Sequence, residues 1–505
     1  MLFSKFPASR RLWYLVMPAV LTVFLHGCAA HQPPLPISAI KGPAAECRDK
    51  LSEFDRLVQS EGAADTQASR IPGYPCFRAN RFLQSFKAGQ YGPKEIAEWL
   101  ERAKKRGDAG RRAELANLPS EVYNNHYLFT SKARLGRQLD ACADHLLAHF
   151  SENPARARRL MAAARVPDDY SSLARVLGVY PVTRLVVLYR LSGHQEETRQ
   201  AFQDLPKGGP AGTVFAPEGP RPDLPPKTRA RMLEKAARSS ALGIPEPGPD
   251  ALEKLFDYFA PAWHVRPWPE SDRIGRPFWQ DPAQIGVDTA DPVTYRFHSF
   301  TRLGRSILLQ LNYVIWFPSR PPAGLLDIYS GRLDGIIWRV TLGADGRAAL
   351  YDSIHCCGCF HKYYPVSSGL TPRPEPDTGE PPMILSKNIP DNESARVLLH
   401  LSPRTHYVTG LAPFAQRPQN LETYRMAPYR ALRRLPLENG SRSMFTPDGI
   451  VPGTERLERF LLWPMGVPSA GAMRQRGHHP VTLVGRQYFD EARLLERVFT
   501  WKSTR

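Results

Sequence analysis

Residues 336–354 read IIWRVTLGADGRAALYDSI, and they decide the fold class expected for the larger part of the chain. Two runs rich in β-branched and aromatic residues flank Asp345 and Gly346. An Asp-Gly turn between such runs is typical of a β-hairpin, because glycine accepts the positive φ that a tight hairpin turn needs. We therefore expect an antiparallel sheet beyond Tyr295, with further strands at residues 307–317, 396–401 and 481–484.

The N-terminal part of the chain has helical periodicity instead. Cys47, Leu51, Phe54 and Val58 recur at i, i+4, i+7 and i+11, which places them on one face of a helix. The pattern returns within residues 96–103 and again within residues 135–150. Amphipathic helices must cover one another's apolar stripes. Residues 44–204 are therefore expected to form a helical domain.

Proline is frequent in the chain, including the stretch between the helical part and the strand-rich part. It accounts for 49 of 505 residues, about twice its usual share, and it interrupts hydrogen bonding in helices and central strands. Residues 205–249 contain many Pro and Gly residues and are predicted to be a linker between residues 44–204 and 250–505. The sequence thus predicts an α+β fold, with an N-terminal helical domain followed by a mainly antiparallel β-rich domain with long Pro-rich loops.

The first residues have the pattern of an export signal. Lys5, Arg10 and Arg11 precede an apolar run at residues 12–25. That run is shorter than the roughly 20 residues that span a bilayer as a helix. Residues 1–27 are therefore predicted to be a signal peptide that is removed. The competing interpretation is an ordinary signal peptide that is cleaved elsewhere.

The run ends in Leu25, His26, Gly27 and Cys28, which resembles the lipobox of bacterial lipoproteins. The resemblance implies that Cys28 carries a diacylglycerol, that palmitate is among its acyl chains, and that the protein is anchored in the membrane. His26 departs from the family pattern, which has a small residue there. By the same resemblance, Ala29 implies sorting to the outer membrane, facing the periplasm. Residues 28–43 would then be a Pro-rich tether.

The charge of the chain is strongly positive. The formal net charge is +18, and loss of Lys5, Arg10 and Arg11 would leave +15 on the mature chain. Such a surplus favours nucleic acid, anionic lipid or acidic polymer as the partner. Export disfavours nucleic acid, so anionic envelope polymers are the expected partners. Because the arginines are scattered, a merely solvated basic surface is the alternative.

Common catalytic motifs are absent from the sequence. It contains no GxxxxGK[ST] phosphate loop, HExxH helix, GxSxG elbow or GxGxxG turn. The common nucleotide-binding enzymes and α/β-hydrolases are therefore disfavoured.

Residues 355–361 read HCCGCFH and are the one unusual constellation. Thiolate sulfur and imidazole nitrogen are preferred zinc ligands. In an extended strand the two histidines would be roughly 20 Å apart, so only a bend at Gly358 could gather the ligands. The predicted zinc ligands are His355, Cys357, Cys359 and His361. Asp352 is the nearest candidate base for a zinc-activated water.

Other interpretations of this turn stay open. Cys357 and Cys359 could form a local disulfide, or Cys356 and its neighbours could simply pack as small apolar side chains. Histidines elsewhere could complete a site: His298, His406, His478 and His479.

A disulfide is also predicted in the helical region. Cys47 and Cys142 both lie on apolar faces of predicted helices. Two buried thiols are the alternative.

Residues 311–317, LNYVIWF, and 352–361, DSIHCCGCFH, are similar to a group of uncharacterised proteobacterial envelope proteins. The resemblance implies no activity. Two functions follow from the residues: a lipid-anchored periplasmic protein that acts as a metal-binding hydrolase, or a non-catalytic lipoprotein whose basic surface binds anionic envelope polymers.

Overall fold

The β-hairpin predicted around Asp345 is present in the computed structural model, which describes residues 40–127, 130–203, 212–266, 270–322, 324, 327–387, 389–415 and 418–501. Strand β9 (Gly331–Leu342) pairs antiparallel with β10 (Ala348–His355), and Leu342 lies opposite Ala348. At the turn, the Asp345 carboxylate accepts a hydrogen bond from the Arg347 N–H, and Gly346 has a φ of 74°. The hairpin prediction is confirmed.

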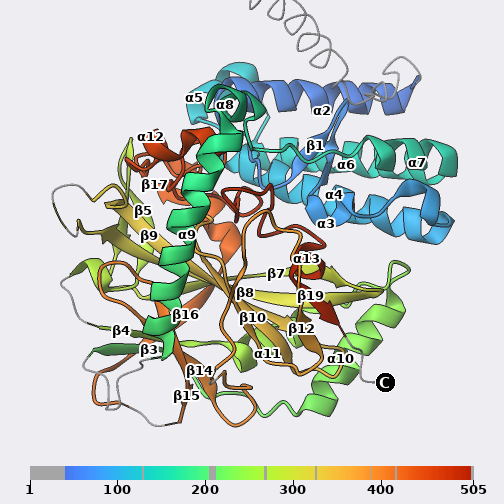
Figure 1. Cartoon of the computed structure of the whole chain (residues 1–505). Helices are drawn as coiled ribbons and strands as arrows, with labels where there is room; N and C mark the ends of the chain where they lie inside the picture. Colours follow the sequence, from blue (N-terminus) through green and yellow to red (C-terminus); the bar gives the residue numbers. More distant parts are fainter. Residues whose placement is uncertain are drawn as a thin grey trace, which may run out of the picture.

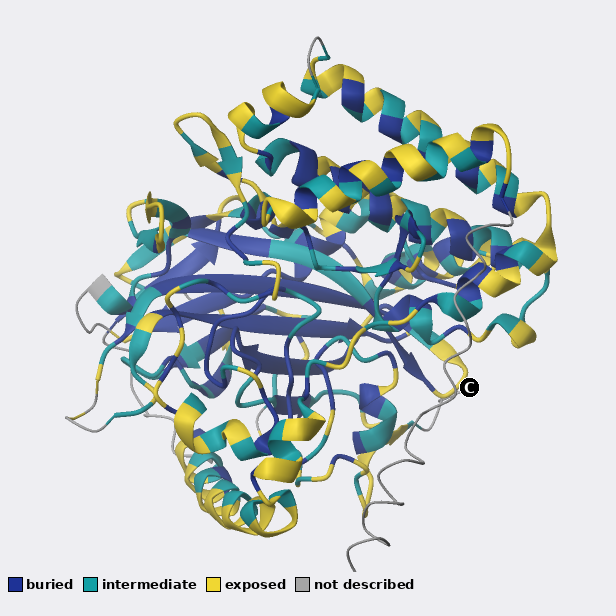
Figure 2. Ribbon diagram, turned by 90° about the horizontal axis from the view of Figure 1, so that it is seen from above, coloured by how far each residue is buried: buried dark blue, intermediate teal, exposed yellow. Residues whose placement is uncertain are grey.

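The hairpin is part of an eleven-stranded mixed sheet with the order β13-β11-β10-β9-β8-β7-β16-β3-β4-β14-β15. Pairing is antiparallel from β11 through to β7, and it is parallel where β16 lies between β7 and β3. The central strands are buried, as the dark blue ribbons in Figure 2 show. The other strands of this sheet are β3 (Thr213–Pro217), β4 (Ala262–Val265), β7 (Val293–Leu303), β8 (Ser306–Arg320), β11 (Lys362–Pro365), β13 (Met383–Ile384), β14 (Arg396–Leu401), β15 (Val408–Phe414) and β16 (Leu421–Pro428).

Helices α2 (Pro43–Ser60), α4 (Pro93–Asn117), α6 (Lys132–Ser151) and α7 (Pro154–Ala163) pack together above the sheet in Figure 1. The predicted apolar stripe is buried, since Leu51, Phe54 and Val58 are at most 2% exposed. A disulfide joins Cys47 of α2 to Cys142 of α6, which is the pair expected from the sequence. The α+β class, with a helical region followed by a large sheet, is confirmed. Between the helices lie β1 (Ser69–Ile71), β2 (Tyr74–Ala79), α3 (Arg81–Gln84), η2 (Ala88–Gln90) and α5 (Ser120–His126).

The described part of the predicted linker, residues 212–249, is not a linker but a structural part of the sheet region. It supplies β3, whose Phe215 is fully buried, and helix α10 (Pro226–Ser239). The prolines delimit these elements rather than prevent them: Pro217 ends β3 and Pro226 begins α10, positions where the missing N–H costs little. The prediction of a linker is therefore wrong for residues 212–249, because the positions of the prolines matter more than their number.

A second boundary also lies elsewhere than expected. Helix α9 (Tyr180–Gln203), predicted within the helical domain, crosses the front of the sheet in Figure 1 and contacts β15. It follows α8 (Ser172–Leu177). The remaining elements are α11 (Pro249–Phe259), η3 (Glu270–Asp272), β5 (Arg276–Asp281), β6 (Gln284–Asp288), β12 (Leu370–Pro372), η4 (Tyr429–Arg433), β17 (Leu435–Leu437), β18 (Gly440–Arg442), α12 (Arg459–Leu462), η5 (Trp463–Met465), α13 (Leu494–Val498) and β19 (Phe499–Trp501).

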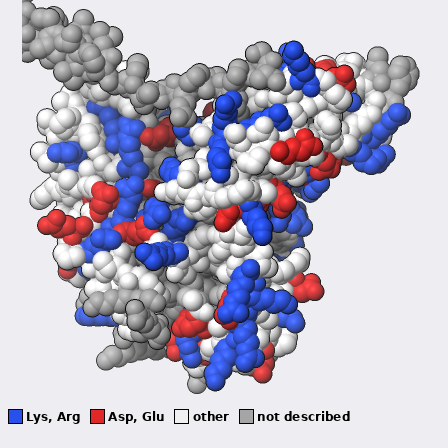
Figure 3. All heavy atoms as spheres, turned by 90° about the vertical axis from the view of Figure 1, so that its right-hand side faces the viewer, with Lys and Arg blue, Asp and Glu red and all other residues white. Residues whose placement is uncertain are grey.

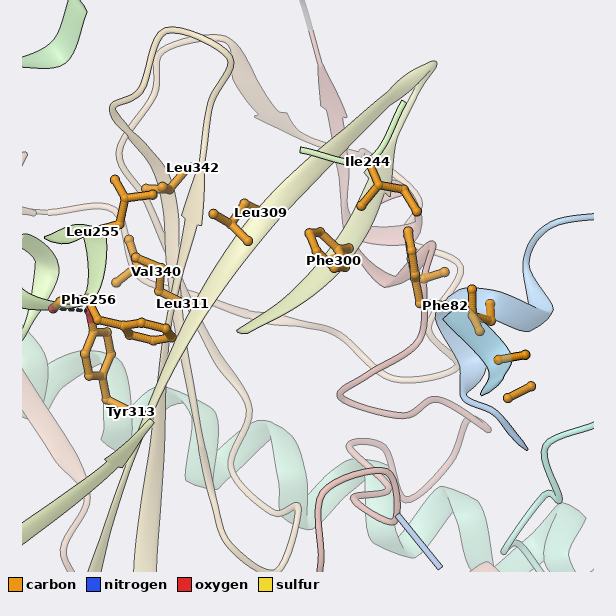
Figure 4. Close-up of a cluster of buried hydrophobic side chains, with 14 of the residues drawn as sticks. Phe82, Ile244, Leu255, Phe256, Phe300, Leu309, Leu311, Tyr313, Val340 and Leu342 are labelled. Carbon is orange, nitrogen blue, oxygen red and sulfur yellow. Dashed lines mark hydrogen bonds between the residues drawn. The ribbon is translucent and has the colours of Figure 1, made fainter. Parts of the chain in front are cut away.

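The helical region and the sheet share one apolar core. Figure 4 shows Phe82 of α3 approaching Phe300 of β7, and the same cluster continues through Leu309 and Leu311 of β8 to Leu255 of α11. Helix α11 is also held by the hydroxyl of Tyr313, which donates a hydrogen bond to the Phe256 carbonyl at 2.8 Å. Within the described residues, no helix is both long and apolar enough to span a membrane.

Candidate functional site

The Cys/His turn connects β10 to β11 and bends at Gly358, as the sequence required. Gly358 has a φ of 94°, and a Cβ at this position would lie 2.3 Å from the carbonyl oxygen of Pro480, so only glycine fits. Cys357 and Cys359 are free thiols, and the Cys359 N–H donates to the Cys357 sulfur at 3.4 Å. Burial raises the pKa of Cys356 well above its ordinary value, so this thiol is neutral near pH 7.

The two histidines of this turn bind different carboxylates. His361 Nε2 lies 2.8 Å from Asp352 Oδ2, whereas His355 Nδ1 lies 3.3 Å from Asp334 Oδ1. In the parts of the chain that the structure describes, no group of three or more His, Cys, Asp or Glu side chains is arranged to hold a metal ion. Zinc at residues 355–361 stays a prediction, and we derive no reaction step through it.

Asp352, the candidate base, is held in a buried ion pair. Its two oxygens accept hydrogen bonds from Nε and Nη2 of Arg339, at 2.9 and 2.5 Å. Burial alone would raise the pKa of Asp352, but the Arg339 charge and the His361 hydrogen bond together lower it. A carboxylate this strongly stabilised as an anion is a weak proton acceptor.

The structure adds a buried His–Asp chain beside this turn. His406 is stacked on Phe317 and lies between two carboxylates, with Nδ1 2.8 Å from Asp334 and Nε2 3.2 Å from Asp272. Burial opposes the charge of His406, but the hydrogen bonds from it to Asp272 and Asp334 raise its pKa. Asp334 thus links His355 to His406, two of the histidines marked in the sequence.

The remaining marked histidines lie apart from this chain. His478 binds Asp169, with the Nδ1–Oδ2 distance at 3.2 Å, and burial lowers the pKa of His479 to about 3. His298 lies 3.3 Å from Glu246 and lines a separate cavity.

That cavity has a volume of about 580 Å³ and lies between α4, α11, β7 and η4. Its volume falls in the range of pockets that bind small molecules or polymer segments, roughly 300–1,000 Å³. Aromatic side chains form part of its wall: Phe82, Phe256, Phe297, Phe300 and Tyr429. We call it the basic pocket because seven Arg and Lys residues line it against four acidic residues. The seven are Arg102, Lys105, Arg106, Arg296, Arg430, Arg433 and Arg476.

Four of these cations pair with neighbouring carboxylates. Arg433 binds Asp65 through two hydrogen bonds of 2.7 Å, and Arg296 binds Glu253. Glu246 binds Arg102 at 2.6 Å and lies 3.5 Å from Lys105. Burial alone would raise the pKa of Glu246, but the hydrogen bond from His298 and the nearby positive charges hold it well below its ordinary value. Glu246 is therefore ionised and already satisfied by the protein.

Arg106 and Arg476 are not neutralised in this way. Among the described residues, no carboxylate oxygen lies within 4.0 Å of a nitrogen of either side chain. Arg106 donates to the Arg102 carbonyl at 3.1 Å, and Arg476 donates to the His298 carbonyl at 3.0 Å while it stacks over Phe297. Each is therefore held in place through a backbone oxygen and forms no ion pair, although the charge of Glu246 acts on Arg106 and that of Asp490 acts on Arg476.

The pKa values of Arg106 and Arg476 are lowered in this arrangement. Burial, and then the charges of Arg476 and Arg102, lower the pKa of Arg106 to about 10. Burial also lowers the pKa of Arg476 to about 10. Both guanidinium groups stay protonated at neutral pH, so two partly desolvated positive charges repel each other across the pocket. An anion bound between Arg106 and Arg476 would offset both the repulsion between their charges and the cost of burying them.

Little in the sequence predicts this pocket, because Arg106 and Arg476 are 370 positions apart and the other cations come from α4, β7 and η4. The only local signal is the basic run at residues 104–106. On the surface, Lys and Arg form several separate patches, as Figure 3 shows for the right-hand side of Figure 1. Comparisons of the chain with family models, with curated proteins and with solved structures found no match.

Proposed function

We propose that this protein is a lipid-anchored, periplasm-facing lipoprotein of the outer membrane that binds an anionic segment of an envelope polymer in the basic pocket. The observation that carries the binding proposal is the pair Arg106 and Arg476, two partly buried guanidinium groups without a carboxylate partner among the described residues. A guanidinium binds carboxylate or phosphate through charge-assisted hydrogen bonds. The aromatic wall would pack against the sugar or other apolar part of the same ligand.

Of the two functions set out from the sequence, this geometry favours binding over metal-dependent hydrolysis. Asp352 is engaged by Arg339, and the histidines of the Cys/His turn bind carboxylates. The basic pocket, in contrast, has an excess of positive charge around a cavity, and Arg106 and Arg476 in its wall form no ion pair among the described residues.

The binding test uses the chain from residue 28 with the Cys28→Ser substitution, which retains the whole of the described fold. An Arg106→Ala, Arg476→Ala double variant should bind oligogalacturonate or polyphosphate about tenfold more weakly or worse, because two charge-assisted hydrogen-bonding groups are lost. Titration calorimetry measures the affinity, and the two probes distinguish carboxylate from phosphate recognition. Raising the salt concentration should weaken binding to the unsubstituted pocket.

The matched control removes two exposed arginines from α6, Arg134→Ala and Arg137→Ala, which lie outside the pocket. This control loses the same net charge and should bind as before. Equal affinity of the pocket variant and the control, or equal binding of neutral dextran, would refute the proposed function.

The anchoring part of the proposal concerns Cys28, which lies outside the described residues. Cells that express the full chain should incorporate labelled palmitate into it, and the Cys28→Ser variant should incorporate none, because serine cannot form the thioether. The Cys76→Ser variant is the control, since Cys76 is buried in the folded protein and should not affect labelling. Label that persists in the Cys28→Ser variant would show that the acyl chain is attached elsewhere.

A further inference from the structure

Helix α9 has an apolar stripe that faces solvent. Val182, Leu185, Val186 and Tyr189 are 58–78% exposed and recur at i, i+3, i+4 and i+7. This is the spacing that normally turns one helix face toward a protein core. Here the stripe lies on the outside of the helix that crosses the front of the molecule in Figure 1.

Two neighbouring segments repeat this feature. On α8, Leu173, Val176 and Leu177 are 57–69% exposed at i, i+3 and i+4. The segment that leads through α12 into η5 also exposes large apolar side chains at helical spacing, among them Phe460 and Leu461.

The three segments adjoin one another. The Ser171 N–H donates to the Gly466 carbonyl at 2.7 Å, and Arg175 Nε donates to the Met465 carbonyl at 2.8 Å, so α8 is seated directly on the end of η5. Helix α9 also contacts η5. We call their combined exposed surface the apolar helical face.

This face accounts for nearly all exposed large apolar side chains. In the described chain, the only ones that lie outside α8, α9 and the α12–η5 segment are Val179, in the turn that joins α8 to α9, and Tyr329. A monomeric soluble protein rarely exposes a contiguous apolar patch of this kind, and where one occurs it marks a membrane or a protein partner.

The charge around the face indicates which partner fits. Between Asp169 and Glu196 the sequence has no acidic residue, and Arg184 and Arg190 are exposed on α9 beside the stripe. Glu458, the residue that precedes α12, is buried, and burial raises its pKa to about 7. A face that is apolar with a basic border is complementary to the anionic surface of a phospholipid bilayer.

Aromatic residues give the same indication. Tyr189 is 78% exposed and Trp463 is 44% exposed. Both residue types prefer the interface between lipid headgroups and hydrocarbon, where an amphipathic ring has one side in each environment.

We infer that the apolar helical face docks on the surface of an anionic phospholipid bilayer. The face does not cross the membrane: its side chains enter the headgroup region while the arginines bind lipid phosphates. Anchoring at Cys28, proposed above, would hold the face near a bilayer, since residues 28–39 can span at most about 40 Å. The inference rests on that proposal for delivery to the membrane only, and it is independent of the basic pocket.

The test removes the anchor and asks whether the face still binds. The chain from residue 28 with Cys28→Ser is mixed with vesicles containing about one-quarter phosphatidylglycerol, and with neutral phosphatidylcholine vesicles, and then sedimented. We expect it to sediment with the anionic vesicles. A Val182→Ser, Leu185→Ser, Val186→Ser variant should partition at least about tenfold more weakly, because three apolar side chains no longer enter the lipid.

Two further variants separate the contributions. Arg184→Gln with Arg190→Gln should weaken binding to anionic vesicles and leave the weaker binding to neutral ones unchanged. Arg134→Gln with Arg137→Gln, two exposed arginines on α6, is the matched control for the change of charge and should bind as before. All substituted side chains are exposed, so the thermal unfolding of each variant should match that of the parent.

Two results would overturn the inference. One is no sedimentation of the Cys28→Ser chain with either vesicle. The other is a dimer in light scattering that the triple variant abolishes, because a second copy would then cover the face. Neither outcome depends on acylation or on polymer binding, which the palmitate and calorimetric measurements test separately.

Discussion

Replacing Glu114 with glutamine should lower the free energy of unfolding by about 3–5 kcal/mol, because it removes the closest counter-charge of the buried Arg78. Glu114 lies on α4 and is 1% exposed. Its carboxylate accepts hydrogen bonds from Arg78 at 2.7 Å, from Arg70 at 2.6 Å and from the Asp65 N–H at 2.9 Å. Asp65 in turn binds Arg433 of η4, so the network joins the helical region to the sheet region.

The same carboxylate gives the variant a distinct pH profile. Burial alone would raise the pKa of Glu114, but the charges of Arg78 and Arg70 lower it. A lowered pKa in the folded state stabilises the protein above the unfolded pKa of roughly 4.3, and this stabilisation is lost as pH falls through the folded-state value. The parent should therefore lose part of its advantage over the Glu114→Gln variant under acidic conditions.

Urea unfolding at several pH values measures both effects. The control is Glu101→Gln, an exposed position on the same helix, which should change stability by less than about 0.5 kcal/mol. If Glu114→Gln behaved like Glu101→Gln at neutral pH, the network would not hold the two regions together as described.

Loss of the Cys47–Cys142 disulfide should also be costly. The two residues are 95 positions apart, and in the chain-entropy model a cross-link of that span contributes about 4.7 kcal/mol. We expect a Cys47→Ser, Cys142→Ser double variant to lose that amount, since the unfolded chain gains the freedom that the cross-link removed.

A reducing agent provides the internal control for this prediction. It should destabilise the parent by the same amount and leave the double variant unchanged. Non-reducing peptide mapping of the purified protein gives the direct readout, and a free thiol at either position would contradict the pairing.

The parts of the fold that could be predicted are those specified by local pattern. The hairpin at Asp345 and the stripe of Leu51, Phe54 and Val58 follow from turn chemistry and from a 3.6-residue period, both of which act within a few residues. Strand β3 could not be predicted in this way. It is five residues long, and its place inside the sheet depends on partners in β4 and β16 that are remote in sequence.

In the candidate site, too, local features could be predicted and contacts between remote residues could not. The bend at Gly358 could be predicted because it lies within a short motif, but the partner of each ligand in that motif could not. Arg339, which engages Asp352, and Asp334, which binds His355, both lie on the neighbouring strand β9. The basic pocket is the extreme case, since Arg106 and Arg476 meet only when the helical region closes on the sheet.

The parallel pairing at the middle of the sheet has a consequence for how the chain acquires its structure. Strand β16 pairs with both β3 and β7. Strands near residues 215 and 295 therefore lack one neighbouring strand until the segment near residue 425 is available to pair with them. Closing such long loops costs conformational entropy before the strand contacts form, and this slows folding. Until the loops close, the edges of apolar strands remain exposed. A nascent or translocating chain of this design therefore needs protection against aggregation until its last third has emerged.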